Sequence, residues 1–315
     1  MKAVVVTRHG GPEVLEVQDV PEPEPGPGEL LVDAEAIGVN FRDVYERDGT
    51  YGGEPPYAAG AEGAGTVVGT GERVAWKAAP GSYAERVLVP EGEAVPIPEG
   101  VSSELAAAVL LQGITAQYLA TSTYAVQPGD DVVVLAAAGG VGGLLTQIVK
   151  LRGGRAIGVT SSDEKARLAR EAGADEVLRY EGFAERVREL TGGGAAVVYD
   201  GIGRTTFDES LDALRPRGFM VLYGAASGQP DPVPIPKIQG KSLYLTRPQL
   251  HQYTATREEL LERAREVFEW VCEGKLKVEI GGRYPLEEAP ARARGPRVAP
   301  DDREAHPAPS RRLSC

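Results

Sequence analysis

The stretch DVVVLAAAGGVGGLLTQIVK, residues 131–150, decides the fold of this chain. Five consecutive apolar or β-branched residues precede the glycines, as in a strand that is buried on both faces. From Val141 onward the apolar residues recur at helical spacing. A strand that passes through glycines into a helix presents the first N–H groups of that helix to an anion, and the helix dipole favours negative charge there. The stretch therefore predicts a phosphate-binding turn.

The residues of this turn have expected roles. Gly139 and Gly140 are expected to allow the tight bend, and Gly142 to let the helix approach the strand closely. Val141 begins the predicted helix, so its N–H is among those that face the anion. The spacing Ala-x-x-Gly-x-x-Gly matches part of the dinucleotide fingerprint Gly-x-Gly-x-x-Gly, which on its own is a weak signal. All four are predicted cofactor-binding residues.

The residues that follow strengthen this interpretation. A second strand at 155–160 leads to a helix at 163–172, with Asp163 or Ser162 as its N-cap and Gly173 just past its end. Strand and helix continue to alternate, which predicts an α/β fold with a doubly wound parallel sheet and a ligand at the carboxyl ends of its strands. The alternatives are such a sheet without a nucleotide, or with a flavin. The other predicted strands are 176–179, 195–200, 219–223 and 243–245, and the other helices are 141–151, 183–191 and 207–213.

The first 111 residues have a different pattern. Short runs with strand period are separated by Gly and Pro turns, and only 102–111 has helical character. Such a segment predicts a small barrel-like β domain. Residues 257–272 form a predicted amphipathic helix that returns the chain to this domain. The predicted strands are 2–7, 15–19, 29–39, 60–68, 72–76 and 81–89.

Composition narrows the function classes. The formal net charge is −12, from 34 Lys and Arg against 46 Asp and Glu, which argues against nucleic acid or an anionic membrane as the main partner. A structural zinc takes about four N or S ligands and a catalytic zinc about three. The two cysteines, at 272 and 315, and the three histidines, at 9, 251 and 306, are scattered along the chain and do not supply such a set. We therefore expect a metal-free, reduced, cytoplasmic protein. No signal peptide is expected, because the first residues begin a strand without a charged region before a long apolar run. No stretch approaches the ~18 uninterrupted apolar residues of a membrane span.

Six segments resemble the zeta-crystallin-type NADPH:quinone oxidoreductases, zinc-free members of the medium-chain dehydrogenase/reductase superfamily. They are residues 36–45, 60–65, 111–116, 137–142, 198–203 and 242–248. The resemblance implies a GroES-like β-barrel catalytic domain, a Rossmann NADP-binding domain, and a cleft between them where the nicotinamide meets its acceptor. It also implies homodimers built through edge strands of the nucleotide-binding sheets. Zinc-dependent relatives have a metal-binding histidine where this chain has Ala61.

The resemblance and the two patterns together set the expected domain boundaries. Residues 1–111 are expected to form the catalytic domain, 112–252 the nucleotide-binding domain, and 253–293 the return to the catalytic domain. Residues 294–315 form an atypical tail, because 290–315 contain five prolines and six arginines and no run suited to a buried strand. One codon choice for 301–308, read one nucleotide later, encodes a segment that resembles the closing strand of the family. This suggests a frameshift near residues 290–295, in the gene or in its sequencing.

The end of the second strand bears on the choice of cofactor. NAD-selective enzymes place an acidic side chain there for the ribose 2′-hydroxyl, whereas here Thr160, Ser161 and Ser162 offer hydroxyls to a 2′-phosphate. Lys165 lies one turn into the next helix, within reach of the same phosphate; a solvated surface lysine is an equal alternative. Asp163, the one acid close by, is expected to cap the helix. This arrangement predicts NADPH.

Other cofactor contacts are expected in both halves of the chain. Gln112 and Thr115, at the domain junction, are expected to bind the nicotinamide carboxamide or to cap a helix. By resemblance, Lys165 and Tyr180 match the family's contacts to the adenosine phosphate, and Arg247 is expected to form an ion pair near the cofactor. The remaining predicted cofactor-binding residues are Gly201, Tyr223 and Gly224.

Hydride transfer to an electron-poor quinone needs no nucleophile and no metal, only reactants held at near-attack distance away from water. By resemblance, Asn40 lies near the nicotinamide, and Tyr45 and Tyr51 lie near the acceptor. A tyrosine there can stack on a quinone or hydrogen-bond to its oxygen; loop packing is the alternative for both tyrosines. Asp43 is expected to bind turn amides, and Arg47 to lie around the same cleft.

Three functions are compatible with these features. The first is an NADPH:quinone reductase. The second is an NADPH-dependent reductase of the carbon–carbon double bond of an enone or 2-alkenal, in which a proton must reach the α-carbon, so that Tyr45 or a water matters more. The third is an AU-rich RNA-binding or structural crystallin-like role, which the charge of −12 and the lack of a basic stripe make a poor main role.

Overall fold

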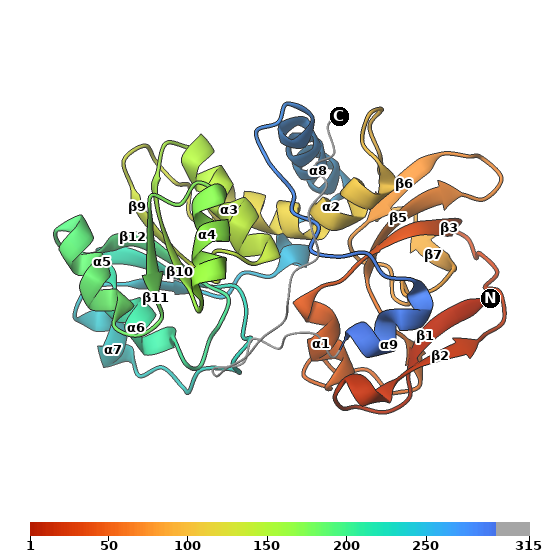
Figure 1. Ribbon diagram of the computed structural model, residues 1–315, viewed down its shortest axis with the longest axis horizontal. Coiled ribbons are helices and arrows are strands. Elements are labelled where there is room, and N and C mark those ends of the chain that lie inside the picture. Colours follow the sequence, from red (N-terminus) through yellow and green to blue (C-terminus); the bar gives the residue numbers. More distant parts are fainter. Residues whose placement is uncertain (294–315) are drawn as a thin grey trace. The chain divides into compact units, whose positions relative to one another are not determined.

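A computed structural model describes residues 1–293 of the chain (Figure 1). The predicted atypical tail, 294–315, and most of the segment on which the frameshift hypothesis depends lie outside the described residues. The chain divides into two compact units. Of the described residues, the first unit contains Met1–Leu111, Thr256–Cys272 and 278–293, and the second contains Gln112–Ala255 and Glu273–Lys277.

A six-stranded, all-parallel sheet forms the second unit, which confirms the predicted doubly wound fold. Its spatial order is β11-β10-β9-β12-β13-β14, so the order reverses between β9 and β12. In open sheets of this kind the ligand lies outside the carboxyl ends of the strands at the point of reversal. The strands are β9 (Asp131–Leu135), β10 (Arg155–Thr160), β11 (Glu176–Arg179), β12 (Ala195–Asp200), β13 (Leu214–Leu222) and β14 (Tyr244–Thr246).

Helices cover both faces of this sheet. Figure 1 shows α3 (Gly140–Leu151) and α4 (Asp163–Glu171) along one face, and α5 (Phe183–Thr191) and α6 (Phe207–Asp212) along the other. Val133 and Leu135 of β9 pack in one cluster with Phe183 and Phe207. Because side chains alternate along a strand, Val132 and Val134 face the α3 side. The short α7 (Ile235–Gln239) precedes β14.

The first unit is antiparallel, as expected for a small β domain. One sheet has the order β2-β1-β4 and the other has the order β7-β3-β5-β6-β8. Trp76 and Val32 are fully enclosed in the core of the larger sheet. The strands are β1 (Lys2–Val6), β2 (Leu15–Asp19), β3 (Glu29–Gly38), β4 (Tyr57–Ala58), β5 (Glu62–Val67), β6 (Arg73–Trp76), β7 (Arg86–Pro90) and β8 (Val95–Pro96).

Two helical features differ from the sequence prediction. Residues Phe41–Arg47 form helix α1, which the prediction of almost no helix before residue 102 missed. Its signal is local: Asn40 and Asp43 form a capping box, an arrangement that satisfies two N–H groups at a helix start. Helix α2 (Ser103–Tyr118) runs past the predicted end at residue 111 and continues as a π-helix, η2 (Leu119–Thr123). The predicted return helix is α8 (Arg257–Cys272).

The segment formed by α2 and η2 has the length and apolar character of a membrane span. It covers 21 residues, and its most apolar window of 18 residues has a mean hydropathy of 1.2. However, 72% of its most apolar window is buried inside the protein. A core helix passes the same test of length and composition, and its apolar side chains here are enclosed by the protein itself.

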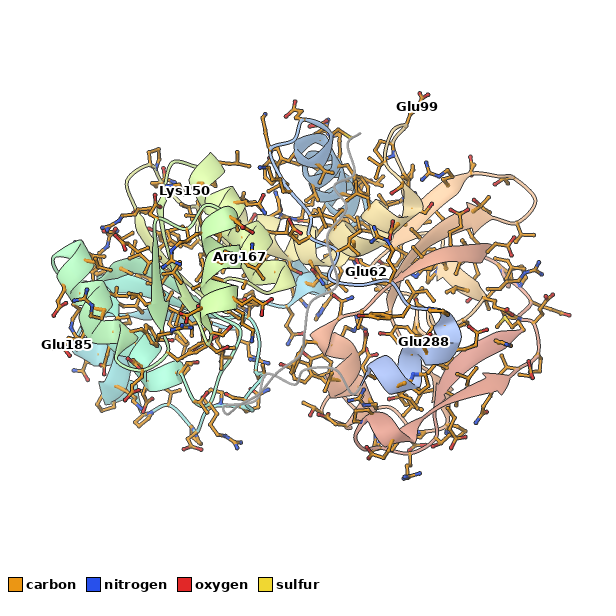
Figure 2. All side chains as sticks on the ribbon, viewed as in Figure 1. Glu62, Glu99, Lys150, Arg167, Glu185 and Glu288 are labelled. Atoms are coloured by element: carbon orange, nitrogen blue, oxygen red, sulfur yellow. The ribbon has the colours of Figure 1, made fainter. Side chains whose placement is uncertain are left out.

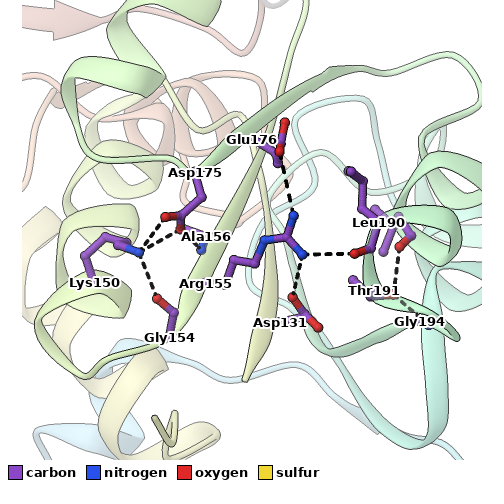
Figure 3. Close-up of polar contacts among 11 residues, drawn as sticks. Asp131, Lys150, Gly154, Arg155, Ala156, Asp175, Glu176, Leu190, Thr191 and Gly194 are labelled. Carbon is purple, nitrogen blue, oxygen red and sulfur yellow. Dashed lines mark hydrogen bonds and ion pairs between the residues drawn. The ribbon is translucent and has the colours of Figure 1, made fainter. Parts of the chain in front are cut away.

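Charged side chains tie together the amino ends of β9, β10 and β11 (Figure 3). Lys150 Nζ lies 2.7 Å from each oxygen of Asp175, and Asp175 Oδ2 also accepts the Ala156 N–H at 2.7 Å. Arg155 lies 3.4 Å from Asp131 and 3.7 Å from Glu176. Burial alone would raise the pKa of Asp175, but the hydrogen bonds from Lys150 and Ala156 outweigh it and lower that pKa.

We predict that Asp175→Asn lowers the free energy of unfolding by about 1 kcal/mol at neutral pH, because it removes the ion pair with Lys150. The loss is no larger because the Asp175 side chain is partly exposed and solvent screens its ion pair. The lowered pKa means that this contribution is present above the unfolded-state pKa of about 3.9 and is lost as the pH falls. Urea unfolding should therefore show a difference that shrinks toward about pH 3. Arg167→Gln, which removes an exposed ion pair with Glu171, is the control and should change little. An equal effect of both variants would contradict the prediction.

Candidate functional site

Residues 136–142, which comprise the loop between β9 and α3 and the first residues of α3, form the centre of the candidate site and are called the glycine turn here. Ala136 adopts a left-handed conformation with φ of 51°, and its carbonyl accepts the Gly139 N–H at 2.8 Å. Gly139 is the N-cap of α3, with φ of −81°. The expectation that Gly139 and Gly140 make the tight bend possible was therefore wrong, since the left-handed residue is Ala136.

Gly142 is required by space, whereas a Cβ at Gly140 would meet only the end of the Gln112 side chain. A Cβ at Gly142 would lie 2.2 Å from the Ala136 carbonyl oxygen, so the close approach expected at Gly142 is present. A Cβ at Gly140 would lie 1.9 Å from Gln112 Oε1, so this side chain packs directly over the glycine turn. The first N–H groups of α3, including that of Val141, have no acceptor within the helix. The turn is thus a backbone cradle suited to a phosphate.

At the end of β10 the structure separates the predicted hydroxyls. Thr160 is 1% exposed, and its Oγ1 has no hydrogen-bond partner within the described residues. Ser161 is exposed and accepts a hydrogen bond from Lys165 Nζ at 3.1 Å. Ser162 is the N-cap of α4 and accepts the Lys165 N–H at 3.2 Å. Of the three hydroxyls assigned to a phosphate, Thr160 is buried and Ser162 caps the helix, so Ser161 is the accessible one.

The role expected for Asp163 was also wrong. Asp163 is the first residue of α4, and its carboxylate pairs with Arg179 at the end of β11. Arg179 lies opposite Thr160 in the strand register, so a second cation joins Lys165 at this edge of the sheet. Sequence reasoning missed Arg179, although its position at a predicted strand end was a usable signal.

Tyr180, which follows Arg179, reaches the glycine turn. Its hydroxyl accepts the Ala136 N–H at 3.2 Å. Burial raises the pKa of Tyr180 to about 12, so the hydroxyl keeps its proton at neutral pH. Because the oxygen already accepts a bond from the backbone, the proton remains available for a second acceptor such as a ligand oxygen.

The loops after β12 and β13 complete this edge of the second unit. The buried Asp200 accepts two backbone N–H groups and the hydroxyls of Thr206 and Ser210, which fixes the loop that carries Gly201. A Cβ at Gly224 would lie 2.5 Å from the Gly201 carbonyl oxygen, and one at Gly201 would lie 2.8 Å from the Tyr223 ring.

Arg247 and Thr115 are two further residues that were predicted to contact the cofactor. Arg247 donates to the Gly224 carbonyl at 3.4 Å and forms no ion pair within residues 1–293, so the expected ion pair is absent there. Thr115 lies buried on α2, three residues after Gln112.

The first unit holds a buried cluster of acids that we call the acid network. Asn40 Nδ2 donates to Glu62 Oε2 at 2.6 Å, and the Asn40 N–H donates to Asp43 Oδ2 at 2.8 Å. Tyr83 also donates to Asp43 Oδ2, at 2.8 Å, and the Leu111 N–H donates to Glu62 Oε1 at 2.7 Å. Figure 2 shows Glu62 among the ribbons of this unit, whereas Glu99 extends from a loop at the periphery.

Burial dominates the electrostatics of this network. It raises the pKa of Glu62 to about 8 and that of Asp43 to about 6, although hydrogen bonds from Asn40 oppose both shifts. The expectation that Asp43 binds backbone amides agrees with its bond to the Asn40 N–H. The sequence prediction missed Glu62, because its partners Asn40 and Leu111 lie far from it along the chain.

The predicted acceptor tyrosines lie on and just after α1. The rings of Tyr45 and Tyr51 are 5.0 Å apart, and Phe41 contacts Tyr45 at 5.1 Å. Tyr51 is 53% exposed, so one tyrosine of the pair is open to a ligand. Arg47, expected beside them, is instead buried and donates to the Gly10 carbonyl at 3.3 Å. Within residues 1–293, no group of three or more His, Cys, Asp or Glu side chains is placed to hold a metal.

Comparison with family models gives two matches. Residues 26–79 match the alcohol dehydrogenase GroES-like domain, and residues 140–266 match the zinc-binding dehydrogenase model.

Comparison with individual proteins gives relatives that extend over nearly the whole chain. A quinone oxidoreductase from Pseudomonas aeruginosa is 44% identical over 303 residues, covering 91% of this chain and 93% of the relative. A 2-haloacrylate reductase from Burkholderia is 40% identical over 310 residues, covering 92% and 93%. The crystal structure of Escherichia coli quinone oxidoreductase complexed with NADPH matches with a TM-score of 0.90 and 37% identity, covering 93% of this chain and 95% of that one.

We predict that Gly142→Ala destabilises the protein by about 2 kcal/mol or more and abolishes dinucleotide binding, because its Cβ meets a backbone oxygen that cannot move aside. Gly143→Ala is the matched control, since a Cβ there comes no closer than 3.7 Å to Ala137 O. It should be neutral or stabilising, as alanine is favoured over glycine in a helix. Thermal unfolding and titration with NADPH would measure both effects. Equal tolerance of the two variants would contradict the steric role of Gly142.

Proposed function

The chain belongs to the quinone oxidoreductase family of the medium-chain dehydrogenase/reductase superfamily, and we propose that it reduces a quinone with NADPH. The observation that carries the proposal is the backbone cradle of the glycine turn together with two cations, Lys165 in the first turn of α4 and Arg179 at the end of β11. NADPH bound there supplies a hydride, and a quinone that takes up the hydride and a proton becomes a hydroquinone.

The second unit is the proposed cofactor-binding unit. The N–H groups of Gly140, Val141 and Gly142 would bind the pyrophosphate, with Tyr180 as a hydroxyl donor beside them. Ser161 and Lys165 would hold the 2′-phosphate, because a hydroxyl and an ammonium group are already joined at 3.1 Å on an exposed edge. The other proposed contacts are Gln112, Thr115, Gly139, Thr160, Gly201, Tyr223, Gly224 and Arg247.

The first unit is the proposed catalytic unit. Its residues bind and orient the acceptor, exclude water and supply no nucleophile. Tyr51 is half exposed beside Tyr45, and such a pair can stack on a flat quinone and donate a hydrogen bond to its oxygen. Asn40 is the polar group proposed to orient the nicotinamide. These three residues form the proposed catalytic set.

A homodimer and a cytoplasmic location are part of the same proposal. Strand β14 is an edge strand with Tyr244 54% and Leu245 38% exposed, which suits pairing with a second copy of the chain. Cys272 is an exposed free thiol, as a reducing compartment permits.

We predict that Lys165→Glu raises the KM for NADPH about tenfold or more while changing the KM for NADH little, since about 1.4 kcal/mol of phosphate attraction is lost. Arg167→Glu makes the same charge change on the same helix and is the control. Steady-state kinetics with both cofactors would test this. Equal changes for NADPH and NADH would remove the 2′-phosphate role from Lys165.

A second candidate, reduction of an activated carbon–carbon double bond, is supported by the similarity to 2-haloacrylate reductase. Rates of NADPH oxidation with 9,10-phenanthrenequinone and with an enone would separate the two. We predict a higher kcat/KM for the quinone, because reduction of an enone also requires a proton to be delivered to its α-carbon, whereas a quinone takes up its proton on oxygen. A higher kcat/KM for the enone would favour the second candidate.

A further inference from the structure

Glu62 carries a buried carboxyl at the start of β5, and the strand itself does not require a carboxyl there. The residue is 1% exposed, and each of its carboxyl oxygens is bound by one N–H group, from Asn40 and Leu111. No Lys or Arg side chain pairs with it within the described residues. A buried carboxyl without a counter-ion costs stability, so a function for it is expected.

The surrounding backbone is fitted to this carboxyl. A Cβ at Gly38 would lie 2.4 Å from Glu62 Oε2 and 2.6 Å from the Ala107 carbonyl oxygen, so β3 and α2 enclose the carboxyl closely. At the start of α1, the Asn40 N–H donates to Asp43 Oδ2 and the Asp43 N–H donates to the Asn40 carbonyl at 3.1 Å, which holds the backbone of Asn40. The Asn40 carboxamide, carried by this fixed backbone, donates from Nδ2 to Glu62.

We propose that Glu62 is a positioning residue that fixes the carboxamide of Asn40 through Oε2 while Oε1 anchors the same carboxyl to the Leu111 N–H of α2. Its importance for the reaction rests on the proposed function, in which Asn40 orients the nicotinamide. The second part of the proposal is that this contact depends on the ionisation of Glu62. An ionised carboxyl accepts both N–H groups with full charge, whereas a protonated one offers a weaker acceptor.

The ionisation falls in an accessible range. Burial raises the pKa of Glu62 to about 8, opposed by the donors Asn40 and Leu111 and reinforced by Asp43. Other ionisable groups near the network are Tyr83, which donates to Asp43, and Arg47, which lies near Tyr83. Two further groups on α1 act on Asp43: Glu46 raises its pKa and Arg42 lowers it. Helix α2 contributes backbone groups at Ala107 and Leu111. Asp43, with a pKa of about 6, is already ionised when Glu62 titrates.

The sign of the effect on stability follows from the raised pKa. Between an unfolded-state value of about 4.3 and the folded value, the folded protein holds a proton that the unfolded chain has lost. The contribution of Glu62 is therefore most favourable at low pH and is lost as the pH rises through about 8. Asn40 is held most firmly in the alkaline range, where the protein pays this stability cost.

The test uses the full chain and Glu62→Gln. For the wild type, we expect kcat/KM with NADPH and quinone to rise with increasing pH, with an apparent pKa near 8. For Glu62→Gln, we expect that this rise is absent and that kcat is about tenfold lower. Glu35→Gln is the matched control, because Glu35 accepts the rotatable hydroxyls of Ser103 and Thr66 at 2.5 and 2.6 Å. In an Asn40→Ala background, Glu62→Gln should have no further effect. An unchanged pH profile in Glu62→Gln would overturn the proposal.

A second measurement needs neither activity nor a folded variant. The side-chain amide signal of Asn40 in ¹⁵N-labelled wild-type protein should shift with an apparent pKa near 8; an amide that does not titrate would refute the inference. If the protein oxidises NADPH with no quinone, the proposed function is refuted. The titration of the Asn40 amide signal would then still test the contact between Glu62 and Asn40. If the protein reduces quinones but the Asn40 amide signal does not titrate, the proposed function stands and the positioning role of Glu62 is refuted.

Discussion

The approach of helix α3 to the Ala136 carbonyl is the constraint on which the second unit depends. Gly142 lets the two backbones meet, Ala136 takes the left-handed conformation that turns the chain, and Tyr180 holds the Ala136 N–H. Because the turn lies at the point where the strand order reverses, the same backbone geometry that packs the helix also points its N–H groups outward. Packing and the proposed phosphate recognition are thus two results of one arrangement.

Much of the fold could be predicted because its signals are local and repeated. Buried parallel strands such as 131–135 appear as unbroken apolar runs, and their alternation with helices fixes the fold class before any contact is known. Helix α1 was missed because it is short and its start is marked by Asn40 and Asp43. Polar residues of these types are also typical of a binding site. Capping residues at a helix start are hard to tell from binding residues without the helix in view.

The candidate site was predictable where it follows the chain and not where it depends on distant contacts. Lys165 and Ser161 are four residues apart, so their proximity follows from a helix start. Glu62 and Asn40 are 22 positions apart, and Leu111 is 49 beyond Glu62, so only strand pairing and the placement of α2 bring them together. The burial that perturbs Glu62 is likewise a property of the folded unit, which no local pattern reveals.

The pair between Asp163 and Arg179 has a consequence for how the protein responds to its medium. Asp163 is fully exposed, so its attraction to Arg179 is an interaction in water that dissolved ions screen over about 10 Å at 0.1 M ionic strength. As electrolyte concentration increases, the carboxylate is released beside the proposed 2′-phosphate position while the pull of Lys165 on that phosphate weakens. The preference between the two nicotinamide nucleotides thus becomes a function of ionic strength, set at the surface of one helix.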